Sequence, residues 1–421
     1  MSGNGRRGRV LVIGGGISGL TAAMEAAEAG ADVTLVEKEA FIGGRVARSN
    51  LYFPKMCPPT CGLEINFRRV KTHPRIRTLT LSTVESIKGG PGSYEATILK
   101  APRFVNSRCT VCGECEKVCP VDRPDAFNMG LSDTKAIYLP FEMAYPARFV
   151  VDEATCLGAD ECGKCVEACP YGAIELDMAP EREEMEFDSV IWATGWDQPD
   201  ASKFEGLGFG RLANVINNVT MERLAALNGP THGKIQRLSD GTAPESVAFV
   251  QCAGSRDENY YKYCSGVCCA ASLKQARYVR EQYPDAQVYI FYIDIRTPGR
   301  LEDFYVATEA DEKLTLVKGK VANITEDPAT GKLTVEAEDA LSGRKVAQPV
   351  DMVVLATGMV PNGIGDTRVE GGVETDEHGF LAINQPQGYL AAGVAKRPTD
   401  VASCNRDATG VALKALHLSA E

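Results

Sequence analysis

The residues of this chain with the clearest chemistry are its cysteines, of which there are 15. Residues 109–120 read CTVCGECEKVCP, which is the spacing C-x2-C-x2-C-x3-C-P. Residues 156–170 read CLGADECGKCVEACP, which is C-x5-C-x2-C-x3-C-P. Thiolates are soft anionic ligands for iron, and a tight C-x2-C-x2-C loop brings three sulfurs around one face of a cluster. The two runs together predict a pair of 4Fe-4S clusters.

Each run is expected to give its last cysteine to the cluster of the other run. The predicted ligands are Cys109, Cys112, Cys115 and Cys169 for the first cluster, and Cys119, Cys156, Cys162 and Cys165 for the second. The extra residues 157–161 lengthen the loop before Cys162, so the assignment of Cys156 depends on how this loop folds. Zinc is a poor alternative, because zinc sites do not need eight cysteines with this ending. The stretch resembles two-cluster bacterial ferredoxins and predicts a ferredoxin-like insert over residues 102–178.

A dinucleotide-binding unit is expected at the start of the chain. Its predicted order is a buried strand at residues 10–13, the motif G-x-G-x-x-G at Gly14, Gly16 and Gly19, a helix at 20–29, a strand at 33–36 and the acidic residue Glu37. The first glycine makes a tight turn, the second admits a pyrophosphate to the helix N-terminus, and the third lets the helix pack on the strand. The acid is expected to bind ribose hydroxyl groups. Residues 79–85 and 94–99 read as further strands.

The glycine motif alone does not distinguish NAD from FAD, and further motifs favour FAD. Gly43-Gly44-Arg45 follows the acidic residue, and Ala-Thr-Gly ends two expected strands at residues 193–195 and 356–358. Here the chain resembles the two-dinucleotide-binding flavoproteins of the thioredoxin reductase type, which implies an α/β fold interrupted by the insert. The residues expected to contact FAD are Gly14, Gly15, Gly16, Ser18, Gly19, Glu37, Lys38, Gly43, Gly44, Arg45, Val84, Ala193, Thr194, Gly195, Gly358, Gly393 and Val394.

A second, degenerate nucleotide-binding unit is expected over residues 241–350. Residues 246–252 read as its first strand, but the following QCAGSRDENYYKYCSGVCCAASLKQA lacks the glycines that pyrophosphate binding requires. We interpret this segment as a nicotinamide domain that has lost its nicotinamide site. Four cysteines stand there instead: Cys252, Cys264, Cys268 and Cys269. By spacing alone they fit a third 4Fe-4S cluster and a set of core cysteines about equally well.

Three cysteines lie outside these groups. Cys57 and Cys61 flank a Pro-Pro-Thr loop. They are either a redox-active pair, since thiol pairs exchange electrons with reduced flavins, or packing cysteines. Cys404 is isolated and is interpreted as a packing cysteine. The last strand is expected to end at Gly393 and Val394, without the acidic residue that follows this glycine in the flavoprotein family.

The composition is that of a globular chain with several domains. The chain has 421 residues, of which 44% are hydrophobic and 24% charged. A net charge of -11 disfavours nucleic acid as a partner, because phosphates need a basic excess. No apolar run approaches the roughly 18–20 residues of a membrane span, so membrane association is expected only through partner subunits. The cysteine usage favours a reducing, cytoplasmic compartment.

The expected domain order follows from these motifs. It is an FAD domain in three parts (residues 1–101, 179–240 and 351–421), the ferredoxin-like insert (102–178) and the degenerate nicotinamide domain (241–350).

Taken in order, these features resemble the A subunit of heterodisulfide reductase and its relatives. The resemblance rests on GGGISG with its Gly-Gly-Arg turn, the cysteine pair in the next loop, the insert, and the QC…C…CC segment. It implies that Cys252, Cys264, Cys268 and Cys269 hold a third 4Fe-4S cluster beside the flavin. The compact length and the loop MCPPTCGLEINFRRVK further resemble the A subunit of the quinone-interacting membrane-bound oxidoreductase complex of sulfate reducers.

The resemblance implies an FAD and iron–sulfur electron-transfer subunit of a multisubunit oxidoreductase. The expected role in sulfate respiration is to relay electrons between a quinone-linked membrane partner and an iron–sulfur flavoprotein such as adenylylsulfate reductase, at the inner face of the membrane. The alternatives are a soluble heterodisulfide reductase-type flavin subunit with electron bifurcation left open, and an NAD(P)H-dependent reductase resembling the small subunit of glutamate synthase. Two further alternatives are a dithiol–disulfide reductase that uses Cys57 and Cys61, and a scaffold in which the flavin is purely structural.

Overall fold

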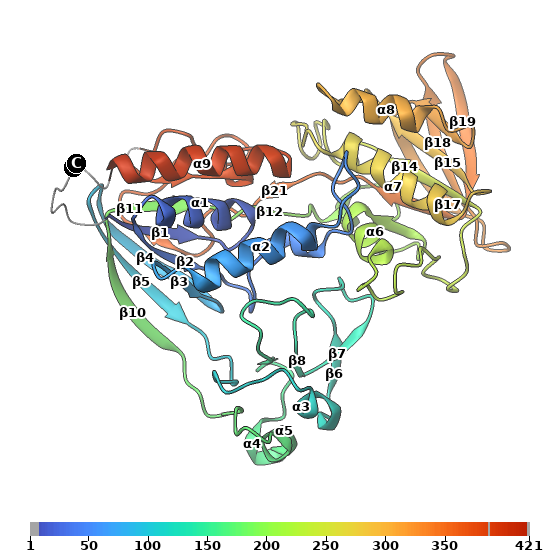
Figure 1. Ribbon diagram of the computed structural model, residues 1–421. Helices are drawn as coiled ribbons and strands as arrows, with labels where there is room; N and C mark the ends of the chain where they lie inside the picture. The colour runs from blue at the N-terminus through green and yellow to red at the C-terminus, as the bar shows by residue number, and fades with distance from the viewer. Residues whose placement is uncertain (1–7, 386–387, 419–421) are drawn as a thin grey trace.

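The structure is a computed structural model that describes residues 8–385 and 388–418 (Figure 1). Its first nucleotide-binding sheet combines strands from both ends of the chain. Its five parallel strands run in the order β23 (Leu390–Ala391), β11 (Ser189–Trp192), β1 (Arg9–Ile13), β2 (Asp32–Val36) and β3 (Ile76–Leu79). In the register, Val12 lies opposite Leu35 on one side and Ile191 on the other.

Side chains of β1 alternate between two cores. Val10 and Val12 pack with α1 (Ile17–Glu28), α2 (Pro59–Thr72) and α9 (Val401–Leu418), whereas Leu11 and Ile13 pack toward an antiparallel sheet. That sheet has the order β10 (Glu181–Phe187), β5 (Ser93–Lys100), β4 (Ser82–Gly90) and β22 (Arg368–Val369). Because both faces of the parallel sheet are covered, β1 is apolar on both sides, as residues 10–13 predict.

The local predictions for this unit are mostly confirmed. The strand, helix and strand expected between residues 10 and 36 are β1, α1 and β2. The strand expected at residues 94–99 is β5. The single strand expected over residues 79–85 is wrong, because β3 ends at Leu79 and β4 begins at Ser82. Leu81 has a φ of 52°, a left-handed conformation that interrupts the extended chain.

The second parallel sheet also has helices on one face and strands on the other. Its order is β13 (Val215–Asn217), β20 (Met352–Leu355), β14 (Ser246–Val250), β15 (Gln287–Tyr292) and β16 (Leu314–Lys318). One face packs against α6 (Asn218–Ala225), α7 (Cys268–Gln282) and α8 (Leu301–Glu309). The other face packs against β17 (Val321–Glu326), β18 (Leu333–Asp339) and β19 (Arg344–Val350). This is a complete nucleotide-binding architecture despite the altered loop after β14.

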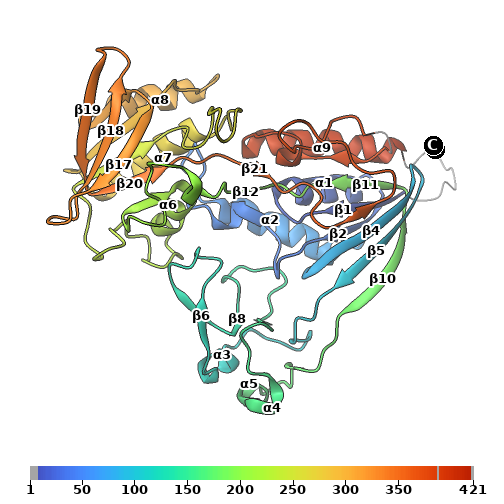
Figure 2. The ribbon, with the colours of Figure 1, turned by 180° about the vertical axis from the view of Figure 1, so that it is seen from behind.

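The insert leaves the first unit after β5 and returns at β10, and these two strands pair antiparallel. It contains the short helices α3 (Glu114–Val118), α4 (Gly158–Glu161) and α5 (Lys164–Ala168) and the hairpins β6 (Asp122–Pro124) with β7 (Asp133–Lys135) and β8 (Ile137–Tyr138) with β9 (Val150–Val151). Figures 1 and 2 show α3, α4 and α5 at a tip far from both parallel sheets.

Two chain crossings connect the parallel-sheet units. The chain enters the second unit through β12 (Trp196–Asp197) and leaves it through β21 (Val360–Pro361), and these strands pair antiparallel. The second unit therefore extends from β13 to β20, so its strands lie on both sides of the boundaries expected at residues 240 and 350. Among the described residues, no helix combines the length and apolar character needed to cross a bilayer.

Candidate cofactor-binding sites

The loop between β1 and α1 is packed so closely that only glycine fits at two positions. Gly14 has a φ of 107°, and a Cβ there would lie 2.4 Å from the carbonyl oxygen of Ala193. A Cβ on Gly19 would lie 1.8 Å from the carbonyl oxygen of Gly14. The loop therefore passes close to the end of β11 and brings the N-terminus of α1 to a cleft. The first turn of α1, all of which the structure describes, has no acidic residue. The partial positive charge at this helix N-terminus is therefore free to bind an anionic pyrophosphate.

Glu37 closes the end of β2 beside this loop. Its side chain is 7% exposed, and it accepts hydrogen bonds from the backbone N–H groups of Gly15 at 2.7 Å and Glu39 at 2.8 Å. Burial raises the pKa of Glu37, while these two N–H groups act in the opposite direction. The carboxylate thus braces the glycine loop and lines the cleft at the position expected for a ribose ligand.

The Gly-Gly-Arg turn lies against the same loop. The N–H of Gly43 donates to the carbonyl oxygen of Gly15 at 2.8 Å, and a Cβ on Gly44 would lie 2.8 Å from the Cα of Gly16. Arg45 donates from Nε to the carbonyl oxygen of Trp196 at 2.8 Å and packs over its ring at 4.8 Å. The arginine therefore ties the phosphate end of the cleft to the first chain crossing.

Most of the residues that the sequence predicts to bind FAD line this cleft. Its empty volume, open solvent included, is about 1660 Å³. Of the predicted residues, it is lined by Gly14, Gly16, Ser18, Glu37, Lys38, Gly44, Arg45, Ala193, Thr194, Gly195 and Val394. Val84 lines an adjoining hollow that also borders Glu37 and Lys38. The donor set and the glycine cradle fit FAD.

Five of the predicted FAD residues line neither the cleft nor the adjoining hollow. Gly15, Gly19 and Gly43 act through the packing described above. Gly358 lies against the side-chain oxygens of Ser255 and Ser265 in the second unit. The N–H of Gly393 donates to Oδ2 of Asp407 on α9 at 2.7 Å, so the amide expected to face the flavin is already bonded within the protein.

The second unit contributes a wall of the cleft that the motifs do not predict. Glu222 on α6 and Lys274 on α7 form an ion pair with Nζ and Oε1 2.8 Å apart, and the side chains are 9% and 7% exposed. Gln275 donates to the same carboxylate at 2.6 Å. These residues are about fifty positions apart in sequence and belong to no motif, so only the packing of α6 on α7 brings them together. Cys404 also lines the cleft and is 4% exposed.

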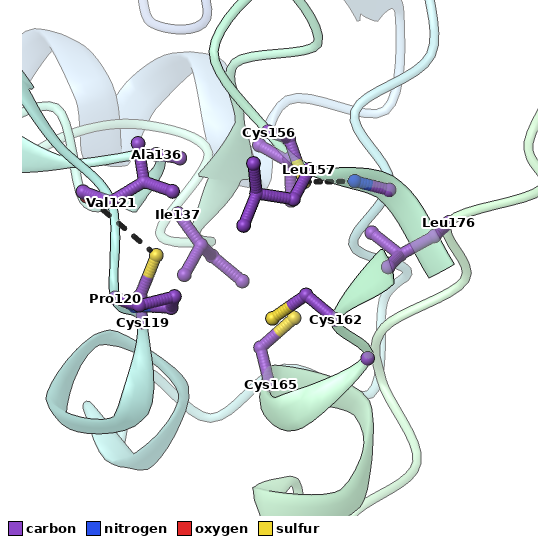
Figure 3. Close-up of a pocket in the computed structure, with 13 residues that line it drawn as sticks. Cys119, Pro120, Val121, Ala136, Ile137, Cys156, Leu157, Cys162, Cys165 and Leu176 are labelled. Carbon is purple, nitrogen blue, oxygen red and sulfur yellow. Dashed lines mark hydrogen bonds between the residues drawn. The ribbon is translucent and has the colours of Figure 1, made fainter. Parts of the chain in front are cut away.

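The eight cysteines of the insert surround two separate hollows. One is lined by Cys109, Cys112, Cys115 and Cys169, and the other by Cys119, Cys156, Cys162 and Cys165. Figure 3 shows the second group around the hollow, with Cys162 and Cys165 side by side and Cys119 and Cys156 coming from two other segments. The structure thus brings together the two predicted sets of four, including Cys156 despite the longer loop after it.

Backbone amides around these sulfurs suit thiolate ligands. The N–H of Gly158 lies 3.4 Å from Sγ of Cys156, and the N–H of Ala173 lies 3.3 Å from Sγ of Cys169. Hydrogen bonds of this kind stabilise clusters and tune their potentials. Among the described residues, no three potential ligands are close enough to share one metal ion.

The four cysteines of the second unit also lie together. Cys252 follows β14, Cys268 and Cys269 begin α7, and Cys264 lies in the loop between, where the N–H of Gly266 approaches its sulfur at 3.4 Å. Burial raises the pKa of Cys252 to about 11, and the neighbouring thiols contribute to this increase. The residues beside this group, Val267 and Ala271, line the flavin cleft. The group therefore borders the cleft, as the family resemblance implies.

The remaining cysteine pair is less suggestive of a site. Cys57 and Cys61 are exposed and free, and Cys61 lies in the first turn of α2. Sγ of Cys57 contacts the carbonyl oxygen of Lys55 at 3.6 Å. Neither belongs to the described lining of the flavin cleft.

Comparison with known proteins agrees with this geometry. The family model "FAD dependent oxidoreductase" matches residues 9–66, and the model "4Fe-4S binding domain" matches residues 148–174. Among solved structures, thioredoxin reductase of T. acidophilum aligns with a TM-score of 0.53 at 14% identity over 98% of both chains. That of Lactococcus lactis aligns with 0.52 at 14% identity, over 98% of this chain and 99% of that one. At this identity the likeness shows the fold alone, and it confirms the predicted thioredoxin reductase-like architecture.

Curated relatives at higher identity cover nearly the whole chain. The A subunit of the "H(2):CoB-CoM heterodisulfide,ferredoxin reductase" of Methanothermobacter marburgensis is 37% identical over 420 residues, which are 97% of this chain and 63% of the relative. The second of two iron–sulfur A subunits of the "CoB--CoM heterodisulfide reductase" of Methanopyrus kandleri is 39% identical over 420 residues, 97% of this chain and 64% of the relative. The chain thus spans slightly less than two thirds of the length of these relatives.

Fold, cleft and family matches define a flavin-dependent, iron–sulfur oxidoreductase subunit. Within this class, the chain is similar over nearly its whole length to heterodisulfide reductase A subunits, which confirms the resemblance seen in its sequence. The more specific similarity to the A subunit of the quinone-interacting complex is not tested by these relatives and stays a prediction.

Proposed function

We propose that this chain is the FAD and iron–sulfur electron-transfer subunit of a multisubunit oxidoreductase of the soluble heterodisulfide reductase type. One observation carries the proposal: Val267 and Ala271, beside the four-cysteine group, line the cleft that fits FAD, and the same chain holds eight more cysteines around two hollows in the insert. When bound, FAD supplies the exchange between two-electron and one-electron chemistry, and 4Fe-4S clusters carry single electrons. We propose three clusters, with the ligand sets named above.

The residues of the cleft have separable roles. The glycine loop and the N-terminus of α1 bind the pyrophosphate, and Glu37 binds the ribose. Lys274 places a buried positive charge in the wall from the second unit, and Glu222 holds its ammonium group in place. A buried cation favours whichever form of a bound group carries more negative charge, so this lysine is expected to raise the reduction potential of the flavin.

The altered loop after β14 explains why electrons are proposed to enter from protein partners. In a nicotinamide domain this loop would carry glycines against the pyrophosphate. Here Gln251 and Cys252 follow β14, and α7 begins with Cys268 and Cys269. Cluster ligands thus occupy the place of a nucleotide site. The end of the insert that carries α3, α4 and α5 lies far from both parallel sheets in Figures 1 and 2, and it is the proposed contact with a partner protein of the complex.

The heterodisulfide reductase-type complex is preferred to the quinone-linked one because the curated relatives are A subunits of heterodisulfide reductases. The quinone-linked role, with adenylylsulfate reductase as acceptor and attachment to the inner face of the membrane, was the first expectation from the sequence. It has less support than the alternative, and the identity of the partners distinguishes the two.

Anaerobic purification of the native complex tests the proposal. We expect about one FAD and about twelve irons per chain, together with other cysteine-rich iron–sulfur subunits. A membrane cytochrome among the co-purifying subunits would instead favour the quinone-linked role. Flavin without iron, or a flavin that does not titrate in potentiometry, would contradict electron transfer and favour the scaffold alternative.

A further inference from the structure

The side chain of Gln251 lies between β14 and the cysteine group of the second unit. The residue is 3% exposed, and its backbone N–H donates to the carbonyl oxygen of Phe291 at 3.0 Å, which continues the sheet by one residue. Oε1 lies 3.0 Å from Sγ of Cys269 and accepts its thiol proton. Nε2 is buried and has no hydrogen-bond partner among the described residues. An unpaired buried donor is energetically unfavourable, so the position of this amide needs an explanation.

Iron binding would reverse what this amide can do. A cysteine binds iron as a thiolate, which accepts hydrogen bonds but cannot donate one. The contact from Sγ of Cys269 to Oε1 would then join two acceptors. A half-turn of the amide exchanges its oxygen and nitrogen at nearly unchanged positions, and the two orientations have similar shapes. The rotated amide places Nε2 at the sulfur and turns Oε1 away from it.

We propose that Gln251 is a positioning residue that donates an N–H···S hydrogen bond to Cys269 and thereby raises the reduction potential of the third cluster. The inference rests on the proposed function, in which Cys252, Cys264, Cys268 and Cys269 hold that cluster. Reduction adds one negative charge to a cluster, and a hydrogen bond donated to its sulfur stabilises the more negative state more strongly. Burial strengthens the effect, because no bulk water screens it.

The charged residues near this cysteine group partly neutralise one another, so a neutral hydrogen-bond donor can still affect the potential of the cluster. Arg256 forms an ion pair with Asp294, and Nη2 of Arg296 lies 3.3 Å from the same carboxylate. Much of the arginine charge is therefore balanced locally. The amide of Gln251 faces the sulfur directly and is held by a backbone that belongs to the sheet. The backbone therefore keeps the side-chain amide close to the sulfur in either orientation.

A hollow lined by Gln251 and Cys252 provides the competing arrangement. It is bordered by residues 204–207 and 320–322 and has an empty volume of about 980 Å³, open solvent included. Water in this hollow could satisfy Nε2 without any rotation. In that case the amide would have no donor directed at the cluster, and replacing it would leave the potential unchanged.

Redox titration of the purified complex, followed by electron paramagnetic resonance, tests the proposal. The variants Gln251→Leu, which removes the donor without adding charge, and Gln251→Glu, which replaces the amide by a carboxylate, are compared with wild type. We expect both variants to make the reduction of one cluster about tenfold less favourable. For a one-electron couple, this lowers the midpoint potential of that cluster by about 59 mV. The control Gln348→Glu changes the same side chain at a partly exposed position on β19, outside the cysteine groups, and is expected to shift no cluster.

A second readout detects the hydrogen bond itself. Exchange of the wild-type complex into deuterated buffer should give a deuterium coupling at the reduced third cluster that Gln251→Leu loses. Unchanged potentials in both variants with iron retained overturn the proposal. Loss of about four irons in both variants would also overturn it, since Gln251 would then serve cluster assembly. Iron for only two clusters in wild type would instead refute the third cluster of the proposed function, before any variant is compared.

Discussion

Nζ of Lys274 lies 2.8 Å from Oε1 of Glu222, and both side chains are more than nine-tenths buried in the wall of the flavin cleft. The pair also joins the two nucleotide-binding units. Lys274 donates to the carbonyl oxygen of Leu51 at 2.7 Å, and Glu222 accepts from the backbone N–H of Asn50 at 2.9 Å. The loop of the first unit is therefore held against α6 and α7 by one buried ion pair.

Breaking this pair on one side should cost more than removing both charges. Lys274→Met leaves the Glu222 carboxylate buried without its cation, and a loss of about 3–5 kcal/mol in stability is expected. The double variant Lys274→Met/Glu222→Gln should recover much of this loss, because no unpaired charge remains. Hydrogen exchange of the amides of residues 49–53 and thermal unfolding measure both effects. A double variant as unstable as the single one would contradict the interpretation. Lys274→Met should also lower the flavin potential.

The pH dependence of the flavin-free chain should contain a contribution from Glu37. Burial raises the pKa of its carboxyl group, so the folded chain binds this proton more strongly than the unfolded chain does. Stability therefore falls as pH rises through the unfolded pKa, and the penalty is complete above the folded pKa. Glu37→Gln removes this titration, so its melting temperature is expected to depend less on pH above 4.5, the ordinary pKa of a glutamate side chain. The same slope in both proteins would show that Glu37 is not the source.

The same variant should weaken flavin retention. Ribose hydroxyl groups that donate to a carboxylate contribute about 1.5–3 kcal/mol each, so an FAD affinity at least about tenfold lower is expected. Equilibrium dialysis of the flavin-free chain with FAD measures it. Unchanged affinity would place the ribose elsewhere in the cleft.

Cys156 should be a cluster ligand although five residues separate it from the next cysteine of its run. Its position with Cys119, Cys162 and Cys165 around one hollow predicts that Cys156→Ala loses about four irons or destabilises one cluster signal. Cys57→Ala is the matched control, since Cys57 is exposed and lies outside the three cysteine groups. Equal iron content in the two variants would remove Cys156 from the ligand set.

Neither NADH nor NADPH should reduce the flavin. The loop after β14 carries Gln251 and Cys252 where a nicotinamide domain needs glycines against the pyrophosphate. Anaerobic titration with each nucleotide, followed by flavin absorbance, is expected to show no bleaching, while dithionite bleaches the same sample. Rapid bleaching by either nucleotide would favour the glutamate synthase-like alternative.

Electron flow should not require the thiols of Cys57, in the loop before α2, and Cys61, in the first turn of α2. Cys57 and Cys61 are exposed and lie outside the described lining of the flavin cleft. The double variant Cys57→Ser/Cys61→Ser is therefore expected to keep full electron transfer to the native partner. A loss of transfer with flavin and iron content unchanged would support the dithiol–disulfide reductase alternative.

The sequence alone predicted the first nucleotide-binding unit, because its requirements are local. Gly14 and Gly19 are needed because a Cβ at either position would collide with the backbone. Residues 10–13 are all apolar because their side chains point alternately into two cores, one on each face of the sheet. The cysteine spacing predicted the two sets of four in the insert for a similar reason, since short loops around a cluster constrain spacing. The same local logic missed the break between β3 and β4, because residues 79–85 remain rich in strand-forming residues across the turn at Leu81.

Only the tertiary structure determined which distant residues face the cleft. Glu222 and Lys274 meet because α6 packs on α7, and no motif marks either residue. The backbone N–H of Gly393 donates to Asp407 because α9 packs next to the end of the last strand of the first sheet. The spacing of residues in the sequence does not predict this contact. Motif positions are thus set by short-range steric and ligand constraints, which a sequence displays. Contacts across the cleft depend on how whole elements pack, and that depends on the complete fold.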